Sequence, residues 1–260
     1  MKYSGKTDIG LKRKSNQDCF AVISRDNFLS AVVCDGMGGA RGGNVASAFA
    51  TKAYSRVVKN ALSKVTPETN ITDDEIIQII TTAVDKANEI VYNTANSDAE
   101  LEGMGTTLVS VLIFGGKAYV ANVGDSRLYA MKNGVLKQIT NDHSFVQFLI
   151  DKGSINAEEA RNHPNRNIIL RALGVNETVT PEIFILNDED YDLLLLCSDG
   201  LTSHVTDEEI TQILLGSNAK RKVSLRKKTE LLIGKANEHG GTDNITAVLI
   251  SKEESSKALV

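Results

Sequence analysis

The stretch Ala31-Val-Val-Cys-Asp35-Gly36-Met-Gly-Gly39 is an apolar, strand-like run that ends in an aspartate set among glycines. Other strand-like or small-residue runs end in the same way, at Asp125, Asp199 and Asp243. A further acidic residue, Asp18, precedes all of them. Carboxylates that converge repel one another unless a cation lies between them, and hard divalent cations prefer oxygen ligands. The pattern therefore predicts strands whose ends meet around a metal site.

The residues around these aspartates indicate which metal they would bind. Asp35, Asp199 and Asp243 have no pair of Cys or His ligands beside them, which favours Mg²⁺ or Mn²⁺ over zinc. Two such ions a few ångströms apart can orient a phosphate and deprotonate a bridging water. A single Asp-Gly pair is most simply a turn. Several strand-end aspartates in one chain are much harder to explain as turns alone.

Length and composition limit the class of protein. The chain has 260 residues, which suits one large domain or two small ones. Its 42% hydrophobic and 24% charged residues are those of an ordinary globular protein. The net charge is −4 and no long basic run is present, so nucleic acid and membrane are poor candidates for partners. The first residues form no apolar signal segment, and the apolar run Leu193–Cys197 is far shorter than the ~20 residues of a membrane span.

The three cysteines, Cys19, Cys34 and Cys197, are too few to make a disulfide framework in a chain of this size. Each lies in or beside a strand-like run. We therefore expect all three to be buried and reduced, and we expect a cytoplasmic, monomeric protein.

Apolar periodicity, turn residues and helix caps indicate the order of the secondary structure. Strands are expected at residues 19–24, 28–34, 106–114, 117–123, 126–131, 135–139, 180–186, 192–198 and 244–251. A glycine-rich loop at 36–43 leads into a helix at 44–62. Further helices are expected after the capping boxes that begin at Thr72 and Thr206, and at 225–237. Strands joined by short turns, with helices in pairs, predict an α+β fold built on antiparallel sheets.

Two local signals add detail. Asn133-Gly134 suits a type I′ hairpin turn. Residues from about 144 to 173 change character, because they are polar and are broken by Pro164. We expect short helices and loops there, with Asn156-Ala-Glu-Glu159 as a helix start.

Short motifs run through nearly the whole chain in a fixed order. They are Arg13-x-x-Asn16-Gln17-Asp18, Val33-Cys-Asp35-Gly36-Met-Gly-Gly39, Gly103-Met-Gly-Thr-Thr107, Asn122-Val-Gly-Asp-Ser-Arg127, Asp142-His-Ser144, Ile169-Leu-Arg-Ala-Leu-Gly174, Ser198-Asp-Gly200 and Gly241-Thr-Asp-Asn244. In this order the motifs resemble those of the bacterial metal-dependent serine/threonine protein phosphatases of type 2C. One Asp-Gly pair is almost uninformative, but the ordered series is highly specific.

The resemblance implies a fold and a domain organisation. It implies a four-layer α-β-β-α sandwich, in which two antiparallel β-sheets are flanked by helix pairs and the metals lie in a cleft at one edge. A single catalytic domain would cover residues 1–252. The segment from about 144 to 173 would form a flap beside the cleft, and residues 253–260 would form a polar tail.

The resemblance also assigns the metal ligands. Asp35 would bridge two ions, and the carbonyl group of Gly36 would coordinate as well. Asp199 and Asp243 would complete the first metal site. Asp18 would lie close to the metals and act mainly through bound water.

Further residues are assigned to catalysis and to substrate binding by the same resemblance. Asp125 matches a weaker third metal site of bacterial relatives. Arg13 matches the arginine that holds the substrate phosphate, and its guanidinium group can grip two phosphate oxygens at once. Together with Asp35 it would carry the catalysis. We expect His163 and Arg166, both in the flap segment, to contact the substrate.

The implied activity is hydrolysis of phosphoserine and phosphothreonine in proteins. A water that bridges two Mn²⁺ or Mg²⁺ ions would attack phosphorus in line, without a covalent phosphoenzyme. Such an enzyme implies a partner serine/threonine kinase whose own phosphosites are natural substrates. Eukaryotic members often carry a histidine, proposed to protonate the leaving alkoxide, where this chain has Met37. The proton would have to come from a metal-bound water, His143 or another group.

Three other functions fit the sequence less well. The segment from Cys19 to Arg25 fits the bare Cys-x5-Arg pattern of cysteine-dependent phosphatases. That segment is strand-like, however, and six extended residues separate its ends by roughly 20 Å, so it could not curl around a phosphate. A catalytically inactive relative that acts as a binding module is disfavoured because all the matching carboxylates are present. A stress-signalling phosphatase acting on an anti-anti-sigma protein would usually lack the Arg13 motif and carry sensor domains.

Overall fold

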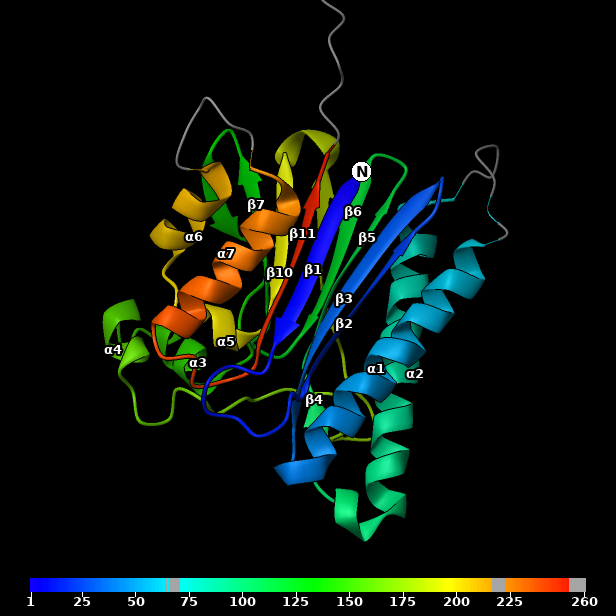
Figure 1. Cartoon of the computed structure of the whole chain (residues 1–260). Coiled ribbons are helices and arrows are strands. Elements are labelled where there is room, and N and C mark those ends of the chain that lie inside the picture. Colours follow the sequence, from blue (N-terminus) through cyan, green and yellow to red (C-terminus); the bar gives the residue numbers. More distant parts are fainter. Residues whose placement is uncertain (64, 66–70, 217–222, 253–260) are drawn as a thin grey trace, which may run out of the picture.

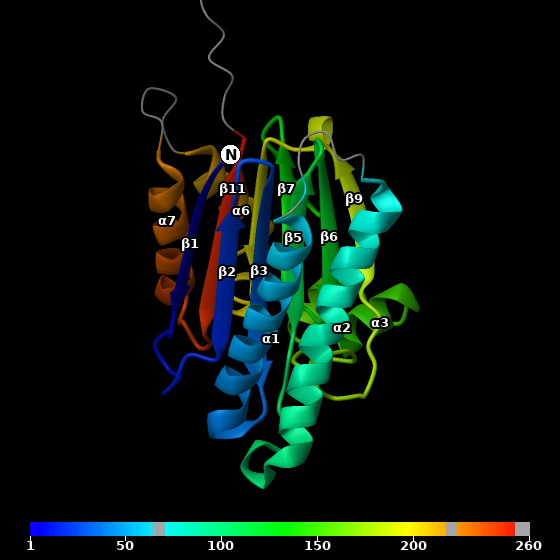
Figure 2. The ribbon, with the colours of Figure 1, turned by 90° about the vertical axis from the view of Figure 1, so that its right-hand side faces the viewer.

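The computed structural model describes residues 1–63, 65, 71–216 and 223–252, and it contains two stacked β-sheets between two layers of helices (Figure 1, Figure 2). The five-stranded sheet has the order β1 (Lys2–Asp8), β11 (Ile245–Ser251), β10 (Leu193–Cys197), β7 (Arg127–Lys132) and β8 (Val135–Gln138). The six-stranded sheet has the order β2 (Asp18–Ser24), β3 (Phe28–Met37), β5 (Leu108–Phe114), β6 (Lys117–Val123) and β9 (Glu182–Asn187), and β4 (Gly105–Thr106) pairs with β3. The strand pairs in both sheets are antiparallel.

The helices form the two outer layers of the sandwich. The long helices α1 (Gly39–Leu62) and α2 (Asp73–Ser97) cover the six-stranded sheet, as Figure 2 shows. The five-stranded sheet is covered by α5 (Asp199–Thr202), α6 (Asp207–Leu215) and α7 (Leu225–Glu238). The short helices α3 (Phe145–Asp151) and α4 (Ala157–Arg161) belong to the flap segment, and two 3₁₀ turns, η1 (Ala99–Leu101) and η2 (Asp188–Asp190), complete the described elements.

Three buried clusters of the described residues hold these layers together, and the central strands of both sheets divide their side chains between two of them. In β3, Val32 and Cys34 face the helices α1 and α2, whereas Ala31 and Val33 face the other sheet. Successive residues of a strand point to opposite faces, and both faces of this strand are covered. That double cover explains why β3 reads as a continuous apolar run, and the layered arrangement confirms the predicted α-β-β-α sandwich.

Several local predictions are confirmed. Capping boxes that begin at Thr72, Asn156 and Thr206 start α2, α4 and α6. Asn133 and Gly134 both have positive φ angles, of 50° and 81°, as a type I′ turn requires. No helix in the described ranges is long and apolar enough to cross a membrane.

Other local predictions need correction. The first strand is expected at residue 19, but β1 begins at Lys2. There the polar sequence Lys-Tyr-Ser-Gly-Lys-Thr-Asp forms an edge strand that pairs with β11. The helix expected from residue 44 begins at Gly39, inside the predicted glycine-rich loop. Cys34 and Cys197 are buried, but Cys19 is partly exposed. The predicted tail at 253–260 lies outside the described residues, and the single domain over 1–252 stays a prediction.

Candidate active site

The strand ends that carry the predicted aspartates meet at one end of the sandwich. Asp18 is the first residue of β2 and lies directly opposite Asp35 of β3. Asp125 lies in the turn between β6 and β7, and Asp199 is the first residue of α5, after β10. Asp243 lies just before β11. Antiparallel pairing therefore gathers carboxylates that are far apart in the sequence.

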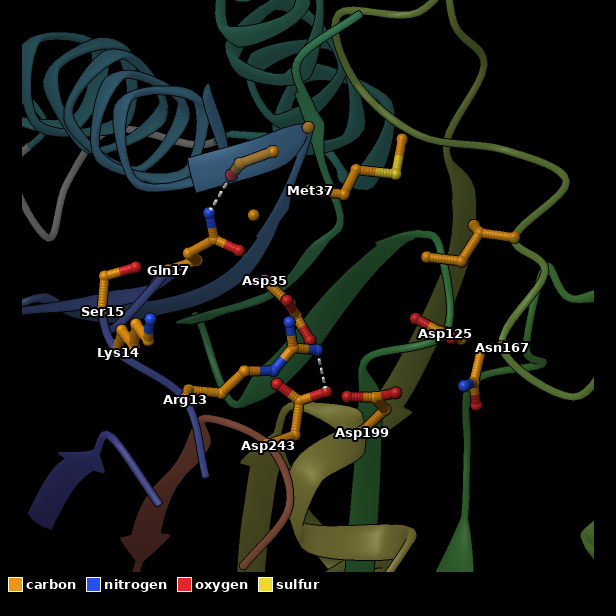
Figure 3. A pocket seen from close by; sticks show the side chains of 14 residues that line it. Arg13, Lys14, Ser15, Gln17, Asp35, Met37, Asp125, Asn167, Asp199 and Asp243 are labelled. Atoms are coloured by element: carbon orange, nitrogen blue, oxygen red, sulfur yellow. Dashed lines mark hydrogen bonds and ion pairs between the residues drawn. The ribbon is translucent and has the colours of Figure 1, made fainter. Parts of the chain in front are cut away.

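A cleft of about 430 Å³ opens at this end of the sandwich, as Figure 3 shows. Four of the five aspartates line it, namely Asp35, Asp125, Asp199 and Asp243. The other lining residues come from the loop before β2, the end of β3, the start of α1 and the flap. They are Arg13, Lys14, Ser15, Gln17, Gly36, Met37, Gly38, Gly39, Asn167 and Ile169. The cleft thus has an acidic floor with basic side chains on one wall.

The backbone around Asp35 is fixed by close packing. Thr107 Oγ1 accepts a hydrogen bond of 2.9 Å from the backbone N–H of Asp35, and the Thr107 N–H donates one of 2.9 Å to the Asp35 carbonyl. A Cβ atom on Gly36 would lie 1.9 Å from the carbonyl oxygen of Gly43. Only glycine therefore fits at position 36, and its peptide is held at the floor of the cleft.

Asn244 holds the loop that carries Arg13. Its Oδ1 accepts a hydrogen bond from the backbone N–H of Gln17 at 2.8 Å, and its Nδ2 donates to the carbonyl oxygens of Ile9 and Ser15, each at 3.0 Å. Because Asn244 follows Asp243, the turn that positions one predicted ligand also positions the predicted phosphate-binding loop. A side chain at Gly200 would lie 1.9 Å from the Asn244 carbonyl oxygen, so glycine is required there as well.

The aspartates perturb one another strongly. Burial raises the pKa of Asp35 well above its usual range, and the charges of Asp18, Asp199 and Asp125 raise it further. Burial also raises the pKa of Asp18 to about 7 and raises the pKa values of Asp125 and Asp199. Each of these carboxylates is costly to ionise in this environment. A cation among them would remove that cost.

The hydrogen bonding of these aspartates also fits a metal. The Oδ1 atoms of Asp18, Asp125 and Asp199 are buried and have no hydrogen-bond partner within the described structure. A buried polar atom without a partner costs free energy, which a bound cation would recover. Among the described residues, no three or more Cys, His, Asp or Glu side chains already form a cluster close enough to hold a metal ion.

Arg13 lies over the acidic floor. Its Nη2 atom is 2.7 Å from Oδ2 of Asp243, and this hydrogen bond, with the nearby negative charges, raises the pKa of the guanidinium group. Figure 3 shows the arginine side chain reaching toward Asp243 and Asp199. Its position in the cleft agrees with its predicted contact with a phosphate group.

His143 does not line the cleft; instead it holds the turn that carries Asp125. Its ring Nδ1 accepts a hydrogen bond of 3.1 Å from the backbone N–H of Gly124, and the backbone N–H of His143 donates to the Gly124 carbonyl at 2.9 Å. An Nδ1 that accepts is unprotonated, and burial lowers the pKa of His143. No histidine lines the cleft in the described part of the chain, and the thioether of Met37 in its wall cannot donate a proton.

The flap places its two predicted residues differently. Arg166 lines a second cavity of about 510 Å³, between the flap and α5–α6, which shares Asp125, Asn167 and Asp199 with the cleft. His163 lines neither cavity: its ring lies 5.9 Å from that of Phe145, and its Nδ1 accepts a hydrogen bond from the N–H of Asn165.

Several residues that line or support the site were not predicted from the sequence. Gln17 lies within a motif, and its position beside Asp18 was the available signal. Asn167 reaches the cleft from an irregular loop, for which no local pattern exists. Lys14 adds a second cation beside Arg13. The supporting role of Asn244 becomes visible only through its contacts across the fold.

Comparison with known proteins agrees with this geometry. The sequence profile of the family described as protein phosphatase 2C matches residues 11–229. The chain is 41% identical to the serine/threonine phosphatase stp of Listeria monocytogenes over 253 residues, which cover 97% of this chain and 96% of that protein. The crystal structure of the serine/threonine phosphatase Stp1 from Staphylococcus aureus superposes with a TM-score of 0.85 at 36% identity, covering 96% of this chain and 94% of that one.

A further solved structure is that of the catalytic domain of the serine/threonine protein phosphatase PstP in complex with two manganese ions. It is 33% identical to this chain and has a TM-score of 0.79, with 95% of this chain and 96% of that chain covered.

The two-sheet sandwich is that of solved serine/threonine phosphatases, one of them a complex with two manganese ions, so its class is that of the metal-dependent phosphatases. The chain belongs to the protein phosphatase 2C family. It is a protein serine/threonine phosphatase, and its activity is metal-dependent. The alternatives of an inactive binding module and of a stress-signalling phosphatase are not favoured by these relatives.

Proposed function

We propose that Asp35 bridges two divalent metal ions, Mn²⁺ or Mg²⁺, at the floor of the cleft. The carbonyl group of Gly36 coordinates beside it, and Asp199 and Asp243 complete the first site. Asp18 acts mainly through water. The observation that carries this proposal is a group of buried aspartates whose negative charges disfavour one another's ionisation. Several of their buried oxygens also lack a hydrogen-bond partner in the described structure. When bound, the ions would supply Lewis acidity and an activated water.

The side chains of the cleft would then bind and orient the substrate. Arg13, held over the floor by the loop that Asn244 anchors, grips two oxygens of the phosphate group. Its charge also stabilises the negative charge on the phosphoryl oxygens during the transfer. Arg166 and His163 adjust the flap to the polypeptide around the phosphorylated residue. Arg166 does so from the wall of the second cavity, and His163 acts indirectly through its packing on Phe145.

A weaker third ion is proposed at Asp125 together with Asp199. The two aspartates line both the cleft and the second cavity, and the charge of Asp199 helps to raise the pKa of Asp125. An ion there would lie at the junction of the cleft with the flap.

The proposed partner is a serine/threonine kinase whose phosphosites are the substrates. The relatives act as serine/threonine phosphatases in bacteria, and such an enzyme needs a kinase to supply its substrates. We place this reaction in the cytoplasm and assign it to a monomer.

Chelation and one substitution test the metal assignment. Excess EDTA followed by dialysis should abolish hydrolysis of p-nitrophenyl phosphate, and Mn²⁺ should restore it. Asp35→Asn keeps the shape of the side chain but removes its charge, so turnover should fall at least about a hundredfold, or ~2.7 kcal/mol of barrier. Asp26→Asn, at an exposed aspartate outside the cleft lining, serves as the control. Full activity in EDTA, or a folded and nearly fully active Asp35→Asn variant, would refute the bridging role.

A further inference from the structure

Two hydroxyl groups from the opposite sheet converge on one oxygen of Asp18. Ser198 Oγ lies 2.6 Å from Asp18 Oδ2, and Thr246 Oγ1 lies 2.7 Å from the same atom. Ser198 and Thr246 are both fully buried. Asp18 belongs to the six-stranded sheet, whereas Thr246 lies on β11 of the five-stranded sheet and Ser198 follows β10. The contacts therefore join the two sheets beside the cleft, since Asp18 lies opposite Asp35 and Ser198 precedes Asp199, both of which line it.

The direction of each hydrogen bond follows from the number of protons. An ionised carboxylate only accepts, so both hydroxyls donate to Oδ2 of Asp18 when that group is ionised. Ser198 Oγ also accepts a hydrogen bond of 3.0 Å from the backbone N–H of Thr246, which fixes its orientation. Thr246 Oγ1 lies 2.8 Å from Thr7 Oγ1 as well, but it has one proton, and the carboxylate is the stronger acceptor. We therefore assign the Thr246 hydroxyl as the donor to Asp18. In the contact between Thr246 and Thr7, the Thr7 hydroxyl is then the donor.

Asn16 extends this arrangement on both sides of Asp18. Its Nδ2 donates to Thr7 Oγ1 at 2.8 Å, and its Oδ1 accepts a hydrogen bond of 3.1 Å from the backbone N–H of Asp18. The result is a cradle in which the backbone and one carboxylate oxygen of Asp18 are held. The other oxygen, Oδ1, is buried and has no hydrogen-bond partner in the described structure.

We propose that Ser198 and Thr246 are positioning residues that fix Oδ2 of Asp18, so that only Oδ1 is presented to the metal site. A carboxylate free to rotate could turn either oxygen away from the metals. Two charge-assisted hydrogen bonds to one oxygen select a single orientation before any ion binds. This inference rests on the proposed participation of Asp18 in metal binding, and it accounts for a serine immediately before Asp199.

The same contacts would be expected if the cradle only stapled the two sheets together, so stability alone does not test the proposal. A positioning role predicts a loss of metal affinity that passes through Asp18. A stapling role predicts a lower melting temperature with unchanged affinity. The readout that separates the two roles is Mn²⁺ binding measured by isothermal titration calorimetry, without substrate.

Thr246→Val removes the hydroxyl and keeps the shape of the side chain. We expect about a tenfold weaker Mn²⁺ affinity at one class of site, the range seen when groups that orient metal ligands are removed. Thr246→Ser restores the hydroxyl and should restore the affinity. Thr229→Val is the matched control, because Thr229 is also buried but donates only to the Leu225 carbonyl within α7. It should bind Mn²⁺ as the unaltered protein does.

A double-mutant cycle with Asp18→Asn shows whether the hydroxyl acts through Asp18. If it does, adding Thr246→Val to Asp18→Asn should weaken Mn²⁺ binding by less than twofold further. Ser198→Ala repeats the test from the second donor should Thr246→Val fail to fold. Wild-type affinity in folded Thr246→Val and Ser198→Ala variants would overturn the cradle, and so would additive losses in the cycle. An unaltered protein that binds no Mn²⁺ would instead overturn the metal assignment itself.

Discussion

Nη2 of Arg13 lies 2.7 Å from Oδ2 of Asp243, so the predicted phosphate-binding residue is paired with a predicted metal ligand. Arg13 is half-exposed and Asp243 partly exposed, which limits such a pair to ~1 kcal/mol or less. The pair therefore orients the arginine without locking it. Asp243 keeps the guanidinium group over the acidic floor, where it can exchange a carboxylate for a phosphate.

The first prediction follows from this weak pairing. Arg13→Ala should raise KM for a phosphopeptide, because a charge-assisted contact with phosphate is worth roughly 1.5–3 kcal/mol. Mn²⁺ affinity should stay close to that of the unaltered protein, since the pair itself contributes little. Lys12→Ala, which removes an exposed cation outside the cleft lining, is the control. If Mn²⁺ binding collapsed while KM did not move, Arg13 would be a structural residue.

Asp35 and Asp199 could be predicted because each follows an apolar strand-like run, a signal that needs no tertiary contact. Asp18 instead begins a strand and Asp243 precedes one, and both were assigned from the motifs in which they stand. The strand β1 could not be predicted in the same way, because an edge strand with exposed residues needs no apolar alternation. Its pairing with β11 is decided by the tertiary fold.

Side-chain partners across the sandwich were also beyond the sequence. His143 was one candidate proton donor, but its side chain instead holds the turn at Gly124. Nothing in the sequence next to His143 indicates that contact. The two hydroxyls on Asp18 come from positions 180 and 228 residues away. Such contacts depend on sheet stacking, for which a single sequence carries no local pattern.

A second prediction concerns pH. Burial raises the pKa of Asp18 from 3.8 to about 7 in the folded protein, and it raises those of Asp35, Asp125 and Asp199 as well. Between pH 3.8 and about pH 7, Asp18 is therefore protonated in more of the folded molecules than of the unfolded ones, so the folded state holds more protons. The free energy of unfolding should therefore fall as pH rises, by about 1.4 kcal/mol per pH unit for each such proton.

Urea unfolding in the presence of EDTA, at about pH 5 and about pH 8, measures this effect. Exposed carboxylates with lowered pKa values, such as those of Asp73 and Asp192, lose their protons below this window and do not obscure it. Asp18→Asn should make the slope shallower, since it removes one of the titrating groups. Stability that rises from pH 5 to pH 8, or a slope unaffected by Asp18→Asn, would contradict the linkage.

A third prediction separates two phosphatase chemistries. Cys19 lies in the extended strand β2, outside the cleft lining. Its backbone lies opposite that of Cys34 in the neighbouring strand β3, and both cysteines are free. Cys19→Ser should therefore leave kcat for p-nitrophenyl phosphate within about twofold, because a strand cysteine cannot act as the nucleophile of a phosphate loop. Complete inactivation of a folded Cys19→Ser variant would revive the cysteine mechanism.

The last prediction concerns the flap. Arg166 lines the second cavity, and His163 packs on Phe145, yet neither lies in the cleft wall. Loops beside a rigid site commonly set specificity. Arg166→Ala and His163→Ala should therefore lower kcat/KM for a phosphopeptide several-fold more than kcat/KM for p-nitrophenyl phosphate, with the larger effect at Arg166. The aryl ester has a good leaving group and few remote contacts, so lost docking should hardly affect it.

Both substrates must be measured on each flap variant, with Arg226→Ala as the control. Arg226 is an exposed arginine on α7, where it pairs with Glu230 within the helix. Arg226→Ala should leave kcat/KM for both substrates unchanged, which would show that losing an arginine charge is not itself harmful. Equal losses on both substrates in Arg166→Ala would mean that the flap supports the catalytic carboxylates, since Arg166 and Asp125 line the same cavity. The flap would then have no separate role in substrate choice.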